Sequence, residues 1–223
     1  GNSNGGNVNV SGLSFASTAT TAVSSVRVGS SLSVTQAYAP SSSAGLFKNT
    51  VTLTNTGLTT VSDVRYTRSM DWDIPPTTFS EYVTINRGTS SNLLFSNDNG
   101  FGTPNPLVNP SDRVLGTRNV SFVDSGPADH GAFFTFGFGA LAAGESKTFN
   151  IFYGATASEA SALSALGTVG AEVFSLGQSG SGREVTGTPA TYIFGFSGVG
   201  GAPVIPAVPE PETYAMLLAG LGL

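Results

Sequence analysis

The chain has 223 residues, no cysteine, a formal net charge of -5 and only 10% charged residues. Nine scattered Lys and Arg residues exclude a phosphate-neutralising nucleic-acid surface, and the lack of cysteine excludes disulfides and thiolate metal sites. The length predicts one domain, or at most two. With 29 glycines and abundant hydroxyl and amide side chains, solubility depends on neutral polar groups, which suits a secreted protein or an assembly subunit.

The N-terminal part predicts short strands joined by small-residue turns. Residues 1–22 are rich in Asn, Gly, Ser, Thr and Ala, so we expect a flexible or edge-strand segment there. Alternation in residues 23–38 predicts two strands around a turn at 29–31. Residues 50–54 alternate Thr with Val and Leu before a Gly-containing loop, which predicts a hairpin whose second strand starts at Val61.

Residues 63–74 separate into two faces when read as a strand, because alternate side chains point to the same side. The apolar face has one exception, Arg68. We interpret Trp72, the sole tryptophan, as a core anchor. The apolar face otherwise carries Val64, Tyr66, Met70, Trp72 and Ile74, and the polar face carries Asp63, Arg65, Thr67, Ser69, Asp71 and Asp73.

The remainder of the body predicts more strands and one helix. A long polar loop is expected over 97–112 and a polar turn over 124–131. A helix is expected at about 156–167, opened by a capping box of Thr156 and Glu159. The strands are expected at 79–85, 93–95, 120–123, 132–138, 147–153, 171–176 and 191–196.

About a dozen short strands separated by glycine-rich turns are typical of an all-β fold. We therefore predict an antiparallel β-sandwich of immunoglobulin-like or jelly-roll type, with one short helix, over residues 23–198. No repeat of fixed period indicates a solenoid or a propeller.

Five aspartates are candidate calcium ligands, because Ca²⁺ prefers carboxylate and amide oxygens. Asp71 and Asp73 share one strand face and would repel each other unless a cation compensates. Further ligands could come from Asp98 in the 97–99 loop, or from Asp124 and Asp129. The alternative is a solvated strand face on which Arg65 or Arg68 pairs with a carboxylate. The spacing is not that of an EF-hand loop.

No catalytic motif stands out. His130 is the sole histidine, and we interpret it as a turn residue that makes a local hydrogen bond, because no Gly-x-Ser-x-Gly elbow supplies a nucleophile. Paired carboxylates of a glycosidase need no local motif, but only Asp71 and Asp73 form a pair, and they lie along one strand. We therefore expect a protein that is not an enzyme.

The C-terminal part differs in composition from the body. Residues 199–213 form a Gly/Pro-rich linker, and residues 214–223 are uncharged and mostly apolar. Pro209, Glu210 and Pro211 before this apolar run resemble the PEP-CTERM sorting signal. Residues 71–74 and 124–131 also resemble PEP-CTERM proteins, whose bodies have no assigned activity. Ten helical residues reach about 15 Å, so the tail as given is a truncated signal that cannot span a membrane.

The resemblance implies export by an exopolysaccharide-producing Gram-negative bacterium, processing by an exosortase and an extracellular or outer-surface location. It also implies a signal peptide, which residues 1–5 do not show, and a membrane contact only while the full-length signal is present. We expect a structural surface or matrix protein that associates with copies of itself and with exopolysaccharide. The alternatives are a calcium-dependent polysaccharide-binding module and, third, a glycan-active enzyme.

Overall fold

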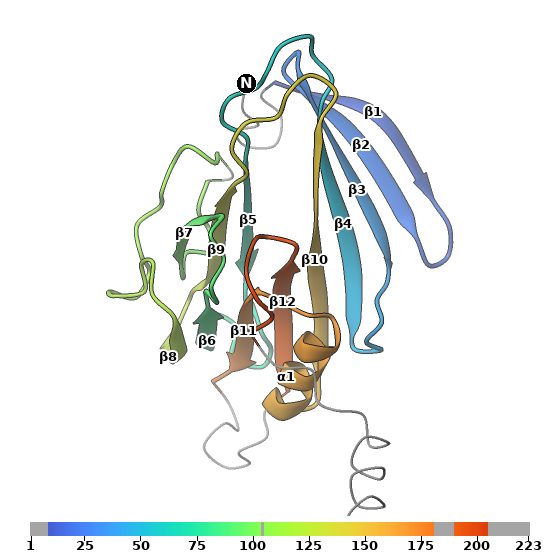
Figure 1. Cartoon of the computed structure of the whole chain (residues 1–223). Helices are drawn as coiled ribbons and strands as arrows, with labels where there is room; N and C mark the ends of the chain where they lie inside the picture. Colours follow the sequence, from blue (N-terminus) through green and yellow to red (C-terminus); the bar gives the residue numbers. More distant parts are fainter. Residues whose placement is uncertain (1–8, 104, 181–189, 205–223) are drawn as a thin grey trace, which may run out of the picture.

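The computed structural model describes residues 9–103, 105–180 and 190–204. It confirms an all-β antiparallel sandwich with one helix, built from two sheets of unequal size (Figure 1). The large sheet has nine strands in the order β1-β2-β3-β4-β10-β12-β11-β6-β8, and the small sheet has three in the order β5-β9-β7. Their bounds are β1 Val10–Ser17, β2 Ala22–Val28, β3 Leu32–Pro40, β4 Leu46–Asn55, β5 Arg65–Asp71, β6 Glu81–Asn86, β7 Leu93–Asn97, β8 Phe122–Ala128, β9 Gly131–Gly137, β10 Ser146–Thr156, β11 Val173–Ser179 and β12 Thr191–Ser197.

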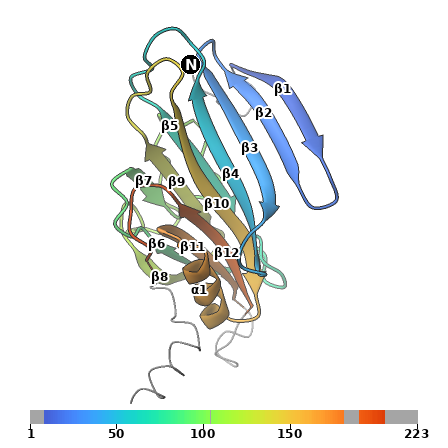
Figure 2. The ribbon, with the colours of Figure 1, turned by 45° about the vertical axis from the view of Figure 1, so that its right-hand side comes forward.

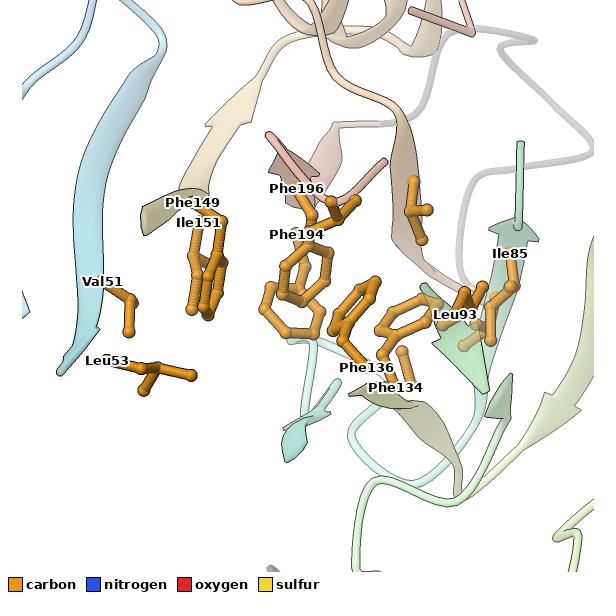
Figure 3. Packing of buried hydrophobic residues seen from close by; sticks show 14 of the residues in the cluster. Val51, Leu53, Ile85, Leu93, Phe134, Phe136, Phe149, Ile151, Phe194 and Phe196 are labelled. Carbon is orange, nitrogen blue, oxygen red and sulfur yellow. The ribbon is translucent and has the colours of Figure 1, made fainter. Parts of the chain in front are cut away.

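The main core lies between the small sheet and the middle of the large one. Phe134 and Phe136 of β9 have no exposed surface, and both contact Phe196 of β12, with ring centroids 5.3 and 4.9 Å away (Figure 3). This explains the phenylalanine-rich run around β9, because that strand is the middle one of the small sheet. Phe149 and Val51 extend the same core onto β10 and β4.

The one helix among the described residues, α1 (Glu159–Thr168), covers the opposite face of the large sheet, where Leu166 packs with Phe152 and Ile193. The predicted capping box was wrong. Thr156 is the last residue of β10, and Ser158 caps the helix by accepting from the Ser161 backbone N–H at 3.3 Å. Thr156 remains in the sheet because it pairs with β12.

Two further predictions were wrong because the segments concerned pair with strands that are distant in the sequence. The strand over 50–54 does not form a hairpin with Val61: β4 pairs with β3 and β10, and Val61 makes only an isolated bridge to Leu141. The predicted turn over 124–131 is largely strand β8, paired with β6. Its Pro127 is tolerated because β8 is an edge strand.

Hydroxyl pairs cross the outer face of the large sheet. Thr52 and Thr148 lie 3.1 Å apart, Thr54 and Ser146 2.7 Å, and Ser25 and Thr35 2.9 Å. These cross-strand hydrogen bonds give the sheet a polar surface with little charge. No helix in the described part of the chain is long and apolar enough to cross a membrane.

The N-terminal strands extend the large sheet beyond the small one. β1 and β2 project away from the sandwich (Figures 1 and 2), and no residue of β2 or β3 is fully buried. Within residues 1–22, predicted as a flexible or edge segment, the described part contains the edge strand β1, which precedes the predicted body. The sorting motif (Pro209, Glu210 and Pro211) and the apolar segment 214–223 lie outside the described residues.

Candidate functional site

Three of the five candidate aspartates meet at one end of β5. Single carboxylate oxygens of Asp71, Asp73 and Asp129 all lie within 4.8 Å of one another. Asp71 ends β5, and its register partner on β9 is Gly131, two residues after Asp129. We call these three residues the acidic cluster. Segments 58 residues apart in sequence are joined there because β5 and β9 pair antiparallel.

A close backbone approach fixes this junction. A Cβ atom at Gly131 would collide with the carbonyl oxygen of Met70 on β5, so glycine is required. The Gly131 N–H donates to the carbonyl oxygen of Asp98 at 2.8 Å, which ties the 97–99 loop to the start of β9. The loop thus holds the cluster in place through its backbone.

The Asp98 side chain itself is no cluster member. It is fully buried, and its carboxylate accepts from the Thr117 hydroxyl at 2.7 Å and from the backbone N–H groups of Arg113 and Val114 at 2.9 and 2.8 Å. Burial raises the pKa of Asp98, but the hydrogen bonds from His130, Thr117 and this backbone outweigh burial and lower the pKa below its ordinary value. Asp98 therefore organises the loop.

His130 is also structural, and its predicted local hydrogen bond was wrong. The ring has no exposed surface; Nδ1 lies 3.0 Å from Asp98 Oδ2, and Nε2 lies 3.2 Å from the Glu81 carbonyl oxygen. Both partners are hydrogen-bond acceptors, so each ring nitrogen faces a protein oxygen rather than solvent. Enclosed in this way, His130 cannot reach a substrate.

Asp124 lies apart from the acidic cluster. Its carboxylate accepts from the Thr84 hydroxyl at 3.3 Å, on the β6–β8 pair. Trp72 is 5% exposed and donates from Nε1 to the Ser175 hydroxyl at 3.1 Å, within the core.

Neither arginine predicted to neutralise Asp71 or Asp73 does so. Arg65 pairs with Asp63 at 2.9 Å, and the Arg68 guanidinium lies over the Tyr153 ring. Arg113 instead pairs with Asp129 at 3.3 Å. Burial, followed by the charges of Asp73 and Asp129, raises the pKa of Asp71. The acidic cluster thus carries more negative charge than its single arginine offsets, which suits a divalent cation completed by water ligands.

Of the four sheet edges in the described part of the chain, three are protected. β8 contains Pro127 and two register irregularities, and β5 carries Arg65, Arg68 and Asp71. β7 is covered by Asn119, whose backbone N–H donates to the Ser96 carbonyl at 2.8 Å and whose Oδ1 accepts from the Ser96 N–H at 2.9 Å. Proline, charge, bulges and covering loops are the usual means of preventing edge pairing.

The fourth edge, β1, is unprotected apart from one bulge between Gly12 and Ser14. Its eight residues include no charged side chain and no proline. Phe15 is 71% exposed, and within residues 9–103, 105–180 and 190–204 β1 has a partner strand on one side only. A strand of this kind presents a row of backbone donors and acceptors that another strand can pair with.

No protein-family model matches the chain, and no characterised protein or solved structure matches it either.

Proposed function

We propose that the protein is an exported structural protein of the cell surface or extracellular matrix that associates with itself through β1. The observation that carries this is the uncharged, proline-free β1 edge at the end of a single-layered sheet extension. The partner is a second copy of the chain. Because the other three described edges are protected, β1 pairs with β1 of the second copy, antiparallel across a two-fold axis. One continuous sheet then runs through both copies. The PEP-CTERM-like tail supports the export.

Lysines on the edge test this pairing. In the double variant Ser11→Lys and Ser14→Lys, each copy brings two added positive charges to the shared edge, and we expect the dimer dissociation constant to rise at least about tenfold. Sedimentation velocity over a concentration series measures it. The matched control, Leu58→Lys with Leu115→Lys, adds the same charge at loop positions that are 97% and 95% exposed, and keeps wild-type association. A strictly monomeric wild type, or equal effects of both variants, refutes the proposal.

The second candidate function is calcium-dependent binding of polysaccharide, and the observation that favours it is the acidic cluster. Three carboxylates on a solvent-accessible end of the sandwich could hold Ca²⁺, with water or sugar hydroxyls as the remaining ligands. The two functions are compatible, because the cluster lies on the sandwich and β1 lies beyond it.

The variant Asp71→Asn tests the acidic cluster, because the variant should be more stable than the wild type without calcium and should lack the stabilisation that calcium gives the wild type. Because the pKa of Asp71 is raised, its ionisation costs stability, and this cost appears as the pH rises above 3.8. In chelator at pH 7 we expect Asp71→Asn to unfold at a slightly higher temperature than the wild type. The gain in the free energy of unfolding should be less than about 1 kcal/mol, because solvent screens the charge, and it should vanish below pH 3. Calcium at about ten times its dissociation constant stabilises the wild type by about 1.4 kcal/mol and leaves the variant unchanged. Thermal denaturation measures both; equal calcium responses contradict the site.

A further inference from the structure

Charge is unevenly distributed over the large sheet. Strands β1, β2, β3, β4 and β10 are neighbours in this sheet and contain no Asp or Glu, although the chain has 14 acidic residues. Their charged residues are Arg27, Lys48 and Lys147. In a chain with a net charge of -5, these five strands therefore form a positive region.

Two of these cations lie on the outer face of the sheet, the face that also carries α1. Arg27 pairs in register with Ser33, and Ser33 pairs with Thr54, so all three share a face. Lys48 is six residues before Thr54 on the same strand and pairs with Phe152, which packs against α1. Strands β2, β3 and β4 run on past the helix, which leaves most of this face uncovered by it (Figure 2).

Neither Arg27 nor Lys48 has an ion-pair, hydrogen-bond or ring partner among the described residues. The acids that flank β10 in the sequence are engaged elsewhere: Glu145 accepts from a backbone N–H at 2.7 Å, and Glu159 accepts from the Gln178 amide at 3.1 Å. Arg27 is exposed and Lys48 partly so, and both are therefore available to an anion from outside the protein. The other described cations have partners of three kinds, namely aspartates for Arg65, Arg113 and Arg118, carbonyl oxygens for Arg87, and rings for Arg68 and Lys147.

Hydroxyl groups occupy the outer face between these two cations. Ser25 and Thr35 lie 2.9 Å apart, and Thr52 and Thr148 lie 3.1 Å apart. A bonded pair of hydroxyls uses one O–H, so each pair keeps one donor and further lone pairs for another molecule. One row of hydroxyl residues crosses five strands in register and consists of Ser14, Ser25, Thr35, Thr52 and Thr148. The next row continues from Arg27 through Ser33, Thr54 and Ser146.

The spacing of the two cations favours a polymer that carries few charges. Arg27 and Lys48 are two strands apart across the sheet and six residues apart along it, which corresponds to about 10 Å and about 20 Å. A nucleic acid carries a phosphate about every 3.4 Å of each strand, so most of its charges over this length would stay unneutralised. An acidic polysaccharide instead carries neutral hydroxyls between its carboxylates, and these hydroxyls match the serine and threonine rows.

We propose that the outer face of β1, β2, β3, β4 and β10 binds an acidic polysaccharide. Arg27 and Lys48 hold carboxylates of its uronate units, Arg27 through parallel N–H donors and Lys48 as a point charge. The hydroxyl rows exchange hydrogen bonds with the sugar hydroxyls. Because single contacts at an exposed surface are weak, the polymer is held by several of them along its length. The inference rests on the proposed matrix location and names the partner there.

Titration with hexagalacturonate, in chelator and at low ionic strength, tests this face. Amide NMR shifts follow the binding, because they also detect weak complexes. The wild type should bind the hexasaccharide at least about tenfold more tightly than its neutral methyl ester. Arg27→Gln with Lys48→Gln should lower the affinity at least about tenfold, because both charge-assisted contacts are lost.

The matched control is Arg65→Gln with Arg118→Gln, which removes the same charge outside the five strands and should bind as the wild type does. No binding by the wild type, equal binding of the ester, or equal effects of the two double variants overturns the proposal.

The hydroxyl rows are tested separately. Thr52→Val with Thr148→Val keeps the side-chain shape but removes one hydroxyl pair, so the affinity should fall at least about threefold. The control, Thr67→Val with Thr135→Val, removes a hydroxyl pair of the small sheet, 2.8 Å apart, and should leave the affinity unchanged. If the first variant binds as the wild type does, or if oligo-dT binds as tightly as the hexasaccharide, recognition is by charge alone and the proposal is refuted.

Self-association and polysaccharide binding are distinguishable. The lysine variant of β1 should lose self-association and still bind hexagalacturonate, because it adds cations and removes none. Arg27→Gln with Lys48→Gln should associate with itself as the wild type does, because neither residue lies on β1.

Discussion

Replacing Asp98 by Asn is expected to lower the free energy of unfolding by about 3 kcal/mol or more. The variant keeps the shape but loses the charge that accepts from Thr117, His130 and two backbone N–H groups, of which the Thr117 and His130 donors are buried. Urea unfolding followed by circular dichroism measures the change. Asp63→Asn is the control, because its pair with Arg65 is half-exposed and is worth less than about 1 kcal/mol. Similar losses in both variants would contradict the role of Asp98.

The same residue predicts a pH dependence. Since the folded-state pKa of Asp98 is lowered, its contribution to stability is complete above the ordinary value of 3.8 and disappears as the pH falls through the lower folded-state value. Asp98→Asn lacks this contribution. The stability difference between wild type and variant should therefore shrink below pH 3.8, and a difference that stays constant down to pH 2 would refute the assignment.

Truncation of Trp72 is the second change with a large expected effect. Trp72→Ala should cost about 3–5 kcal/mol, because the ring fills the core beside β11 and its loss leaves a cavity. The ring lies directly on Gly177, where a Cβ atom would be 2.5 Å from Trp72 Cδ2. Trp72→Phe keeps most of the packing and leaves only the Ser175 hydroxyl without its donor, so about 1–2 kcal/mol is expected.

Urea unfolding at one pH compares these variants with Leu58→Ala. Leu58 is 97% exposed, so its truncation should change stability by no more than about 0.5 kcal/mol. A Trp72→Ala variant no less stable than Leu58→Ala would show that the ring is not a core anchor.

The strands were predictable from local patterns, but their partners were not. Alternation of Thr with Val and Leu over residues 50–54 correctly indicated a strand with one buried face. Its partner on one side, β10, begins about 90 residues later, and no local signal encodes that pairing. The polar composition of residues 124–128 favoured a turn, yet an edge strand tolerates Pro127 and exposed polar side chains.

The candidate site was predictable in part. Asp71, Asp73 and Asp129 were all named from sequence, and the fold brings their carboxylates together. Asp98 was predicted as a further ligand because the 97–99 segment is turn-like. In the structure its carboxylate is buried against His130. Local sequence does not reveal this burial, because it depends on tertiary contacts.

The single-layered extension has a consequence for how the protein opens. Strands β1 and β2 bury little surface, whereas β9 and β12 lie in the core, so the free energy of local opening is uneven along the large sheet. The sheet should open from β1 inward, one strand after another, well before the sandwich unfolds. A second copy paired at β1 would hydrogen-bond to the strand that otherwise opens first. The free energy of local opening of the extension would then approach that of the sandwich.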